Sequence, residues 1–159
     1  MAQNVPGALG ASQFDRDFVT SAYQIILFDR AEGKMAQTEA QDPELRQLAG
    51  KLVAQADEFD ARLSPIAASL GIEPPTILDY DRRLRFGHMR LQRGLDFDAT
   101  YLSDQITSHQ DAVNSQEMMM SKVGEDSRLT ALSQTGLNLI RTNLVRLREL
   151  RRKMMMRGH

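Results

Sequence analysis

Long segments with helical periodicity, separated by a few proline and glycine breaks, are the feature that most constrains this chain. Between the breaks, apolar residues recur every three or four positions, as on the buried face of an amphipathic helix. A strand is indicated by alternating apolar and polar residues between two turns, and no such stretch occurs in the sequence. We therefore predict an all-α fold with long helices over about 12–40, 43–70, 96–123 and 126–153.

Local signals predict where these helices begin and end. Asp42 followed by Pro43 is a typical helix start, with the aspartate as N-cap and the proline at the first helical position. Gly71 is expected to end the second helix, and Pro65 to kink or interrupt its last stretch. The first helix is expected to turn inward Phe14, Phe18, Ala22, Ile25, Asp29, Glu32 or Gly33, and Ala36.

The lengths of the connections predict the topology. Short links join the first helix to the second and the third to the fourth, so each pair should form an antiparallel hairpin. About two dozen residues separate the pairs, and within them 77–94 reads as a shorter helix or connector. One long crossover is typical of a ferritin-like antiparallel four-helix bundle. We expect residues 1–11 to be a flexible N-terminus, 12–153 the bundle, and 154–159 a frayed end.

Composition excludes several classes of function. The 159 residues include no cysteine, so disulfides, thiolate metal sites and cysteine nucleophiles are excluded. The formal net charge is −1, which selects neither nucleic acid nor an acidic substrate. The first dozen residues lack the pattern of an intact signal peptide, and no apolar run is long enough to cross a membrane.

Two stretches resemble a known family. "GKMAQTEAQDPELRQLAGKLV" (33–53) contains a glycine, small residues and a proline–acid helix start, and "GLDFDATYLSDQITSHQ" (94–110) contains Gly-x-x-Phe-Asp-x-x-Tyr followed by a histidine. Together they are similar to the bacterial "domain of unknown function 4142" family, from about residue 14 to 150. The resemblance implies a ferritin-like four-helix protein that is exported, here to the periplasm, with the signal peptide absent from this chain.

The chain departs from the family pattern where histidines are expected. Gln55 and Ala56 occupy the positions of an Asp-His pair in the second helix, and Asn143 that of a histidine in the fourth. Near the family's first-helix glutamate stand Asp29 and Glu32. Of the three histidine positions only His109 is kept, so the resemblance implies a degenerate metal site.

The residues themselves also disfavour a di-iron centre. Such bundles require Glu-x-x-His on two helices, and this motif does not occur in the chain. A mononuclear site remains open, in which Asp29, Glu32 and His109 hold a divalent transition metal such as Zn²⁺, Mn²⁺ or Fe²⁺. Alternatively, His109 is half-buried and hydrogen-bonded, and the acids pair with Arg30, Lys34 or solvent. No other cofactor is expected, and no catalytic residue is assigned.

Three polar residues, Tyr101, His109 and Asn143, suggest a polar layer across the bundle. Tyr101 is expected to donate a buried hydrogen bond to Asp29, Gln105 or Asn143, with His109 in the same layer. Inside the predicted helices, Gly33 and Gly136 are expected to allow close helix contact opposite bulky side chains.

The C-terminal segment carries two further patterns. Methionine triplets occur at 118–120 and 154–156; with His159 the second suggests a Cu(I) site, and the alternative is adaptable packing. Seven basic residues and one acid lie between 141 and 159. They match the helix dipole, or else they contact anionic lipid; nucleic acid is disfavoured because no aromatic residue lies there.

Together these patterns favour a non-catalytic protein that acts by binding or interaction at the bacterial envelope. Two alternatives stay open: a metal-binding or redox protein using Asp29, Glu32 and His109, and an oligomerising stress-response or scaffold module. The partner is an unidentified protein, and a homodimer is one arrangement to test.

Overall fold

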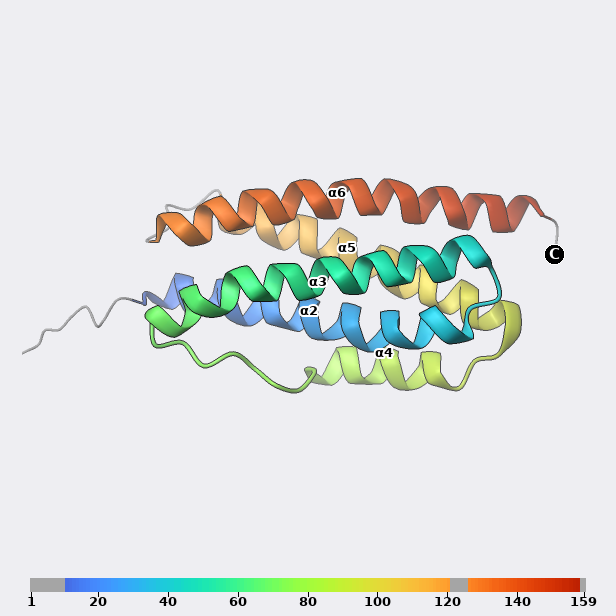
Figure 1. The fold of residues 1–159 in the computed structure, drawn as a ribbon, viewed down its shortest axis with the longest axis horizontal. Helices are drawn as coiled ribbons and strands as arrows, with labels where there is room; N and C mark the ends of the chain where they lie inside the picture. Colours follow the sequence, from blue (N-terminus) through green and yellow to red (C-terminus); the bar gives the residue numbers. More distant parts are fainter. Residues whose placement is uncertain (1–10, 121–125, 158–159) are drawn as a thin grey trace, which may run out of the picture.

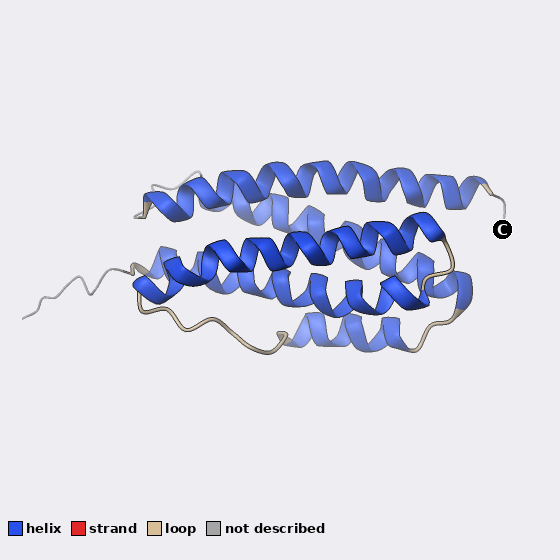
Figure 2. Ribbon diagram, viewed as in Figure 1, coloured by secondary structure: helices blue, strands red, loops and turns tan. Residues whose placement is uncertain are grey.

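Five helices make up the described part of the chain, which is residues 11–120 and 126–157 of the computed structural model. Figure 2 shows helices and loops throughout these ranges and no strand, which confirms the all-α prediction. Four helices are long and one is short. They are α2 (Gln13–Glu39), α3 (Pro43–Ser69), α4 (Tyr80–Arg90), α5 (Gly94–Met120) and α6 (Ser127–Met156).

The long helices lie side by side as two pairs (Figure 1). Helix α2 packs along α3 and α5 along α6, and the pairs meet through α2 against α5 and α3 against α6. The segment between the pairs returns along the outside of the molecule and contains α4, which contacts α2 and α5. The predicted crossover therefore brings a fifth helix against the interface between the two pairs.

Helix starts follow the local sequence. The Ser12 hydroxyl accepts the N–H of Asp15 at 3.0 Å, and the Asp15 carboxylate accepts the Ser12 N–H, so α2 begins with a capping box. Asp42 caps α3 by accepting the N–H of Glu44 at 2.7 Å, ahead of Pro43, as predicted. Asp126 caps α6 in the same way.

Two helices are more continuous than predicted. Helix α3 continues through Pro65, where we expected a kink or an interruption, so an interruption is wrong; Leu63 and Ala67 on either side are fully buried and hold the helix against its neighbours. Helix α6 continues through Met154, where we expected fraying to begin, because that side chain is buried in the core. The N-terminus that we predicted to be flexible lies outside the described residues, apart from Ala11.

Two apolar clusters form the core and leave a polar zone between them. One cluster centres on Leu45, Tyr101 and Leu147, and the other on Phe18, Leu63 and Leu132. Between the clusters, at mid-height of the long helices, lie several polar side chains, among them Asp29, Gln55, His109 and Asn143.

The two glycines predicted to allow close contact do so. A Cβ on Gly33 would lie 2.5 Å from Val53 Cγ2, and one on Gly136 would lie 2.8 Å from Phe59 Cε2. Both distances are too short for a real Cβ, so a side chain at either position would push α2 from α3 or α3 from α6. This prediction is confirmed.

Candidate functional site

A cavity of about 60 Å³ lies at mid-height between α2, α3, α5 and α6. It has room for several water molecules or a hydrated ion, and it is far smaller than the 300 Å³ or more of a typical organic-ligand site. Most of its wall is apolar. The polar side chains that reach it are Asp29, Gln55, His109, Gln116 and Asn143.

His109 presents one ring nitrogen to backbone and keeps the other available. Its Nδ1–H donates to the carbonyl oxygen of Gln105 at 2.8 Å, which leaves the lone pair on Nε2. Burial lowers the pKa of His109 to about 4, although the hydrogen bond to Gln105 opposes this shift. The imidazole is therefore neutral at pH 7, the form that binds a metal or accepts a hydrogen bond.

Asp29 is half-buried, and one of its carboxyl oxygens is fully buried. Its Oδ1 has no hydrogen-bond partner among the described residues. Burial raises the pKa of Asp29 to about 7, and the Arg82 guanidinium on α4 offsets only part of that rise. The predicted pairing with Arg30 is not formed, because Arg30 instead binds Asp57 at 2.6 Å and Asp60 at 2.7 Å on α3.

Glu32 lies one turn further along α2 and is fully buried. Its Oε1 accepts a hydrogen bond from Gln105 Nε2 at 3.0 Å. The Asp104 carboxyl on α5 is also within hydrogen-bonding reach, so burial, this neighbour and Asp29 together hold the pKa of Glu32 far above its usual range. We refer to Asp29, Glu32 and Asp104 as the α2–α5 acid cluster.

Tyr101 lies beside this cluster but bonds to none of it. Its side chain is fully buried, and its hydroxyl has no hydrogen-bond partner among the described residues, so the predicted bonds to Asp29, Gln105 or Asn143 are wrong. Burial, followed by the charges of Asp29 and Glu32, raises the pKa of the Tyr101 hydroxyl well above its usual value. The phenol is therefore a neutral group close to both carboxyls.

Within the described residues, six buried side-chain oxygens have no hydrogen-bond partner, and all six belong to α2 or α5. Buried polar groups normally have such a partner, so this group of oxygens is unusual. They are Asp29 Oδ1, Glu32 Oε2, Tyr101 Oη, Asp104 Oδ2, Gln105 Oε1 and Ser108 Oγ.

On the opposite side of the cavity the polar groups satisfy one another. Asn143 Nδ2 donates to Gln55 Oε1 at 2.7 Å, which links α6 to α3. The Ser133 hydroxyl donates to Gln116 Oε1 at 2.6 Å, which links α6 to α5. The polar layer expected from Asn143 is present, with Gln55 as its partner in place of Tyr101.

Of the predicted triad, Asp29 and His109 line the cavity and Glu32 does not. Glu32 bonds to Gln105 and has Asp104 and Asp29 as its charged neighbours, so Asp29 is the residue common to the cavity and the acid cluster. In the described part of the chain, no three His, Asp or Glu side chains are already grouped as a metal cage. Sequence reasoning missed Asp104, although it follows Tyr101 by three positions and shares that helix face.

Asp98 anchors a turn and has no role in the acid cluster. Its two carboxylate oxygens accept the N–H groups of Gln41 and Asp42, at 2.8 and 2.9 Å, across the α2–α3 turn. Phe97 and Tyr101 on either side are buried in the core. The Phe-Asp-x-x-Tyr run thus holds α5 against the α2–α3 hairpin.

Near the C-terminus, several basic side chains pair with the start of α3. Arg146 and Lys153 contact Glu44 at 2.7 and 3.5 Å, and Arg157 contacts Asp42 at 2.7 Å. Met154 is buried and Met156 is exposed on one continuous helix, so they do not share a face. The third member of the suggested Cu(I) site, His159, lies outside the described residues.

Comparison with known proteins identifies the family. A family model described as "Domain of unknown function (DUF4142)" matches residues 1–150. The chain belongs to the DUF4142 family. Its structure resembles the crystal structure of a DUF305 fragment from Deinococcus radiodurans, with a TM-score of 0.78 and 14% identity over 88% of this chain and 96% of that one. Likeness at that identity shows a shared fold alone.

These matches leave the function of the DUF4142 chain to be argued from its site. A search of curated proteins gave no significant match. Among the described helices, none combines the length and the apolar character that a membrane span requires.

Proposed function

We propose that this DUF4142 chain is a non-catalytic binding protein of the bacterial envelope, and that the α2–α5 acid cluster holds a small cation. One observation carries the proposal. Asp29, Glu32 and Asp104 each present a buried carboxyl oxygen without a hydrogen-bond partner in the described residues. Envelope location follows from the family resemblance and is part of the proposal.

Three carboxyls in one interior zone require compensation. Transfer of an ionised carboxylate from water to the protein interior is costly by several kcal/mol unless it is paired. Protons supply that compensation when nothing else binds, because burial raises the pKa values of Asp29 and Glu32 and so favours their protonated forms. A bound cation would supply it with the carboxylates ionised, and binding would release protons.

Neutral oxygens beside the acids determine which cation is favoured. Tyr101 and Gln105 each add a buried, unpartnered oxygen next to Glu32 and Asp29. Two carboxylates, neutral oxygens and water form a donor set that suits hard ions such as Mg²⁺, Ca²⁺ or Mn²⁺. A hard ion held in this way needs only two carboxylates from the protein, so the lack of a group of three acidic or histidine side chains in the described residues does not exclude it. Asp104 is partly exposed, so an ion can reach the acid cluster from solvent on that side.

A transition metal is the second candidate, because Asp29 and His109 line one cavity. The Nε2 lone pair of His109 and a carboxylate oxygen of Asp29 would provide a nitrogen and an oxygen ligand for Zn²⁺ or Fe²⁺. Substitution of His109 separates the two candidates, since a hard ion in the acid cluster does not need an imidazole.

We further propose that the fold is a ferritin-like four-helix bundle whose metal centre has lost some of its ligands. Support comes from Gln55 and Asn143, the positions where the family resemblance places histidine or its neighbour. They bond to each other beside Ala56 and line the same cavity as His109. With one imidazole in this layer, a pair of metal ions would lack ligands, so a single ion is the expected stoichiometry.

The test is titration of chelator-treated protein with MgCl₂, CaCl₂, MnCl₂ and ZnCl₂, followed by thermal melting and calorimetry. We expect one ion per chain and a raised Tm. The rise should be lost in Asp104→Asn and Glu32→Gln and kept in His109→Gln for a hard ion. Asp111→Asn, an exposed acid on the same helix, is the matched control. A Tm that none of the four ions changes would exclude cation binding.

A further inference from the structure

The outer face of α4 carries an apolar stripe. Of the nine large hydrophobic side chains that are exposed in the described residues, five lie between 77 and 95, on α4 or at its two ends. Tyr80 and Leu84 on the helix and Leu91 at its C-cap are spaced by four and seven positions, so they share one face. The five are Ile77 (67% exposed), Tyr80 (65%), Leu84 (55%), Leu91 (76%) and Leu95 (53%).

Opposite this stripe, α4 is held by few buried groups. Met89 is the one buried residue of α4; it belongs to a core cluster with side chains of the four long helices, and Phe86 packs against the same cluster. These two side chains point inward at about half a turn from the stripe. Attachment to the bundle therefore uses the inner face and leaves more than half of each side chain in the stripe exposed.

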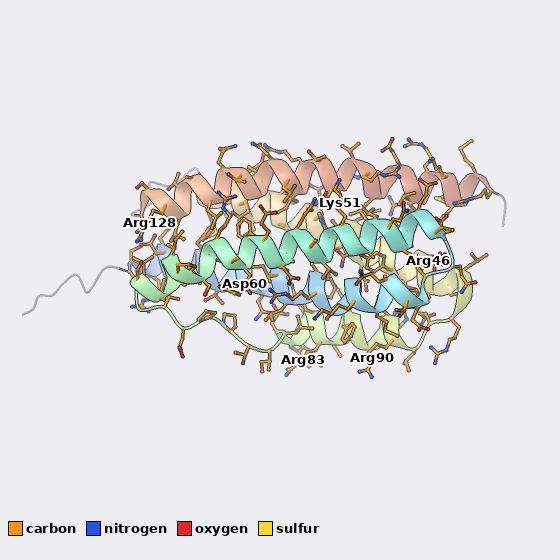
Figure 3. The ribbon with its side chains drawn as sticks, in the orientation of Figure 1. Arg46, Lys51, Asp60, Arg83, Arg90 and Arg128 are labelled. Atoms are coloured by element: carbon orange, nitrogen blue, oxygen red, sulfur yellow. The ribbon has the colours of Figure 1, made fainter. Side chains whose placement is uncertain are left out.

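Arginines flank the stripe. Residues 77–95 include five arginines and two acids, and one of the acids, Asp79, is paired with Arg82. Figure 3 shows Arg83 and Arg90 projecting outward from α4, away from the other helices. Arg90 lies over the Phe86 ring at 5.6 Å, and within the described residues neither Arg83 nor Arg90 has an acidic partner. Their seven-residue spacing places both on the same edge of the apolar face.

We propose that the outer face of α4 docks on an anionic phospholipid surface. A short helix with exposed aliphatic residues on one face and arginines along its edge matches an interfacial helix that lies in the membrane plane. Aliphatic side chains of the stripe would enter the headgroup boundary, Tyr80 would lie at the headgroup level, and the arginine stems would extend to the phosphates. This surface is distinct from the basic end of α6, where Arg146, Lys153 and Arg157 already have acidic partners.

Charge argues against a second copy of this chain as the occupant. Two α4 helices packed on their stripes would bring Arg83 and Arg90 of each copy near those of the other, with Asp81 as the one acid available on each helix. An anionic bilayer satisfies both the stripe and the arginines. The area exposed by a single short helix predicts weak, reversible and salt-sensitive attachment.

The experiment measures flotation of the full chain with phosphatidylcholine vesicles and with equal mixtures of phosphatidylcholine and phosphatidylglycerol, at low and high salt. We expect binding to the anionic vesicles at low salt only. The double substitutions Leu84→Ser with Leu91→Ser, and Arg83→Gln with Arg90→Gln, should each reduce retention about tenfold or more. Val145→Ser, which changes an exposed apolar residue on α6, and Arg151→Gln with Arg152→Gln are the matched controls.

A spectroscopic probe locates the contact. The chain contains no tryptophan, so Tyr80→Trp places a single tryptophan in the stripe, and its emission can be excited selectively above the absorption of tyrosine. Its emission should shift to the blue with anionic vesicles, whereas that of Val145→Trp should not. Failure of the unsubstituted chain to float with anionic vesicles would overturn the proposal, as would equal loss in the α6 controls. A concentration-dependent dimer abolished by Leu84→Ser with Leu91→Ser would assign the stripe to a second copy instead.

Discussion

The carboxyl group of Glu32 on α2 lies within hydrogen-bonding reach of the carboxyl group of Asp104 on α5. A protonated Glu32 can donate from its second oxygen to Asp104, while Oε1 accepts from Gln105 at 3.0 Å. A like-charged pair in the interior cannot ionise twice without compensation. The state of this pair therefore reports whether a proton or a cation occupies the site.

Glu32→Gln imitates the protonated carboxyl, because the amide can donate to Asp104 and still accept from Gln105. In chelator-treated protein we expect its free energy of unfolding at pH 7 to stay within about 0.5 kcal/mol of the original. Glu32→Ala removes both bonds and leaves a cavity, so it should lose about 2–4 kcal/mol. Urea denaturation measures both. A large loss in Glu32→Gln would mean that Glu32 is ionised in the folded protein.

Asp29 and His109 make opposite contributions to the pH dependence of stability. The folded pKa of Asp29 is raised from 3.8 to about 7, so its ionisation destabilises the fold progressively as the pH rises through that interval. The folded pKa of His109 is lowered from 6.5 to about 4, so stability is lost as the pH falls through that interval. Between pH 4 and 6.5 the two contributions have opposite slopes and largely offset each other.

Asp29→Asn should remove one side of that balance. Relative to the unsubstituted chain, its unfolding free energy should rise between pH 5 and pH 8 by a few kcal/mol, on the order of 2–4. Below pH 6.5 its stability should fall more steeply with acid, because the His109 contribution is no longer offset. Denaturation at five pH values checks this, with Asp111→Asn as control. Parallel curves for all three proteins would show that Asp29 is ionised normally.

Local sequence was sufficient to predict the cap that begins α3 and the glycine that ends it, but not to predict whether a helix continues past a proline or toward the C-terminus. The caps at Asp42 and the break at Gly71 depend on neighbours within a few residues, so pattern alone located them. Passage of α3 through Pro65 and of α6 through Met154 depends on burial against other helices. Those contacts have no counterpart in the sequence around either residue.

The same distinction explains what was missed at the site. Asp29, Glu32 and His109 were identifiable as polar residues on predicted inner faces. The pairing of Glu32 with Asp104 depends on the register of α2 against α5, two helices that the crossover separates. Periodicity gives the face of a residue but not its height relative to a distant helix, so Asp104 and Gln55 could not be assigned as partners.

Close contact at Gly136 predicts a specific energetic coupling. In Gly136→Ala the new methyl group would overlap the Phe59 ring, so we expect a loss of about 1–3 kcal/mol. In the background Phe59→Leu, which makes room at the same place, the alanine should cost clearly less. Gly87→Ala is the control, since a Cβ there meets nothing within 4 Å and the residue lies in a helix; it should gain about 0.5–1 kcal/mol. Additive losses at Gly136 and Phe59 would contradict the contact.

Asp98 should prove to be a stability residue whose loss affects the α2–α3 turn. Asp98→Ala leaves the buried N–H of Asp42 without an acceptor and exposes that of Gln41 to solvent, so we expect a loss of about 2–4 kcal/mol. Asp98→Asn keeps one acceptor but turns an NH₂ toward the other donor, and should lose an intermediate amount. Hydrogen exchange at the Gln41 and Asp42 amides should accelerate in both variants, beyond the change at amides of α6. Cation binding in the acid cluster should persist wherever the variant remains folded, because Asp98 bonds the turn. A variant that is stable yet unable to bind the cation would instead place Asp98 at the site.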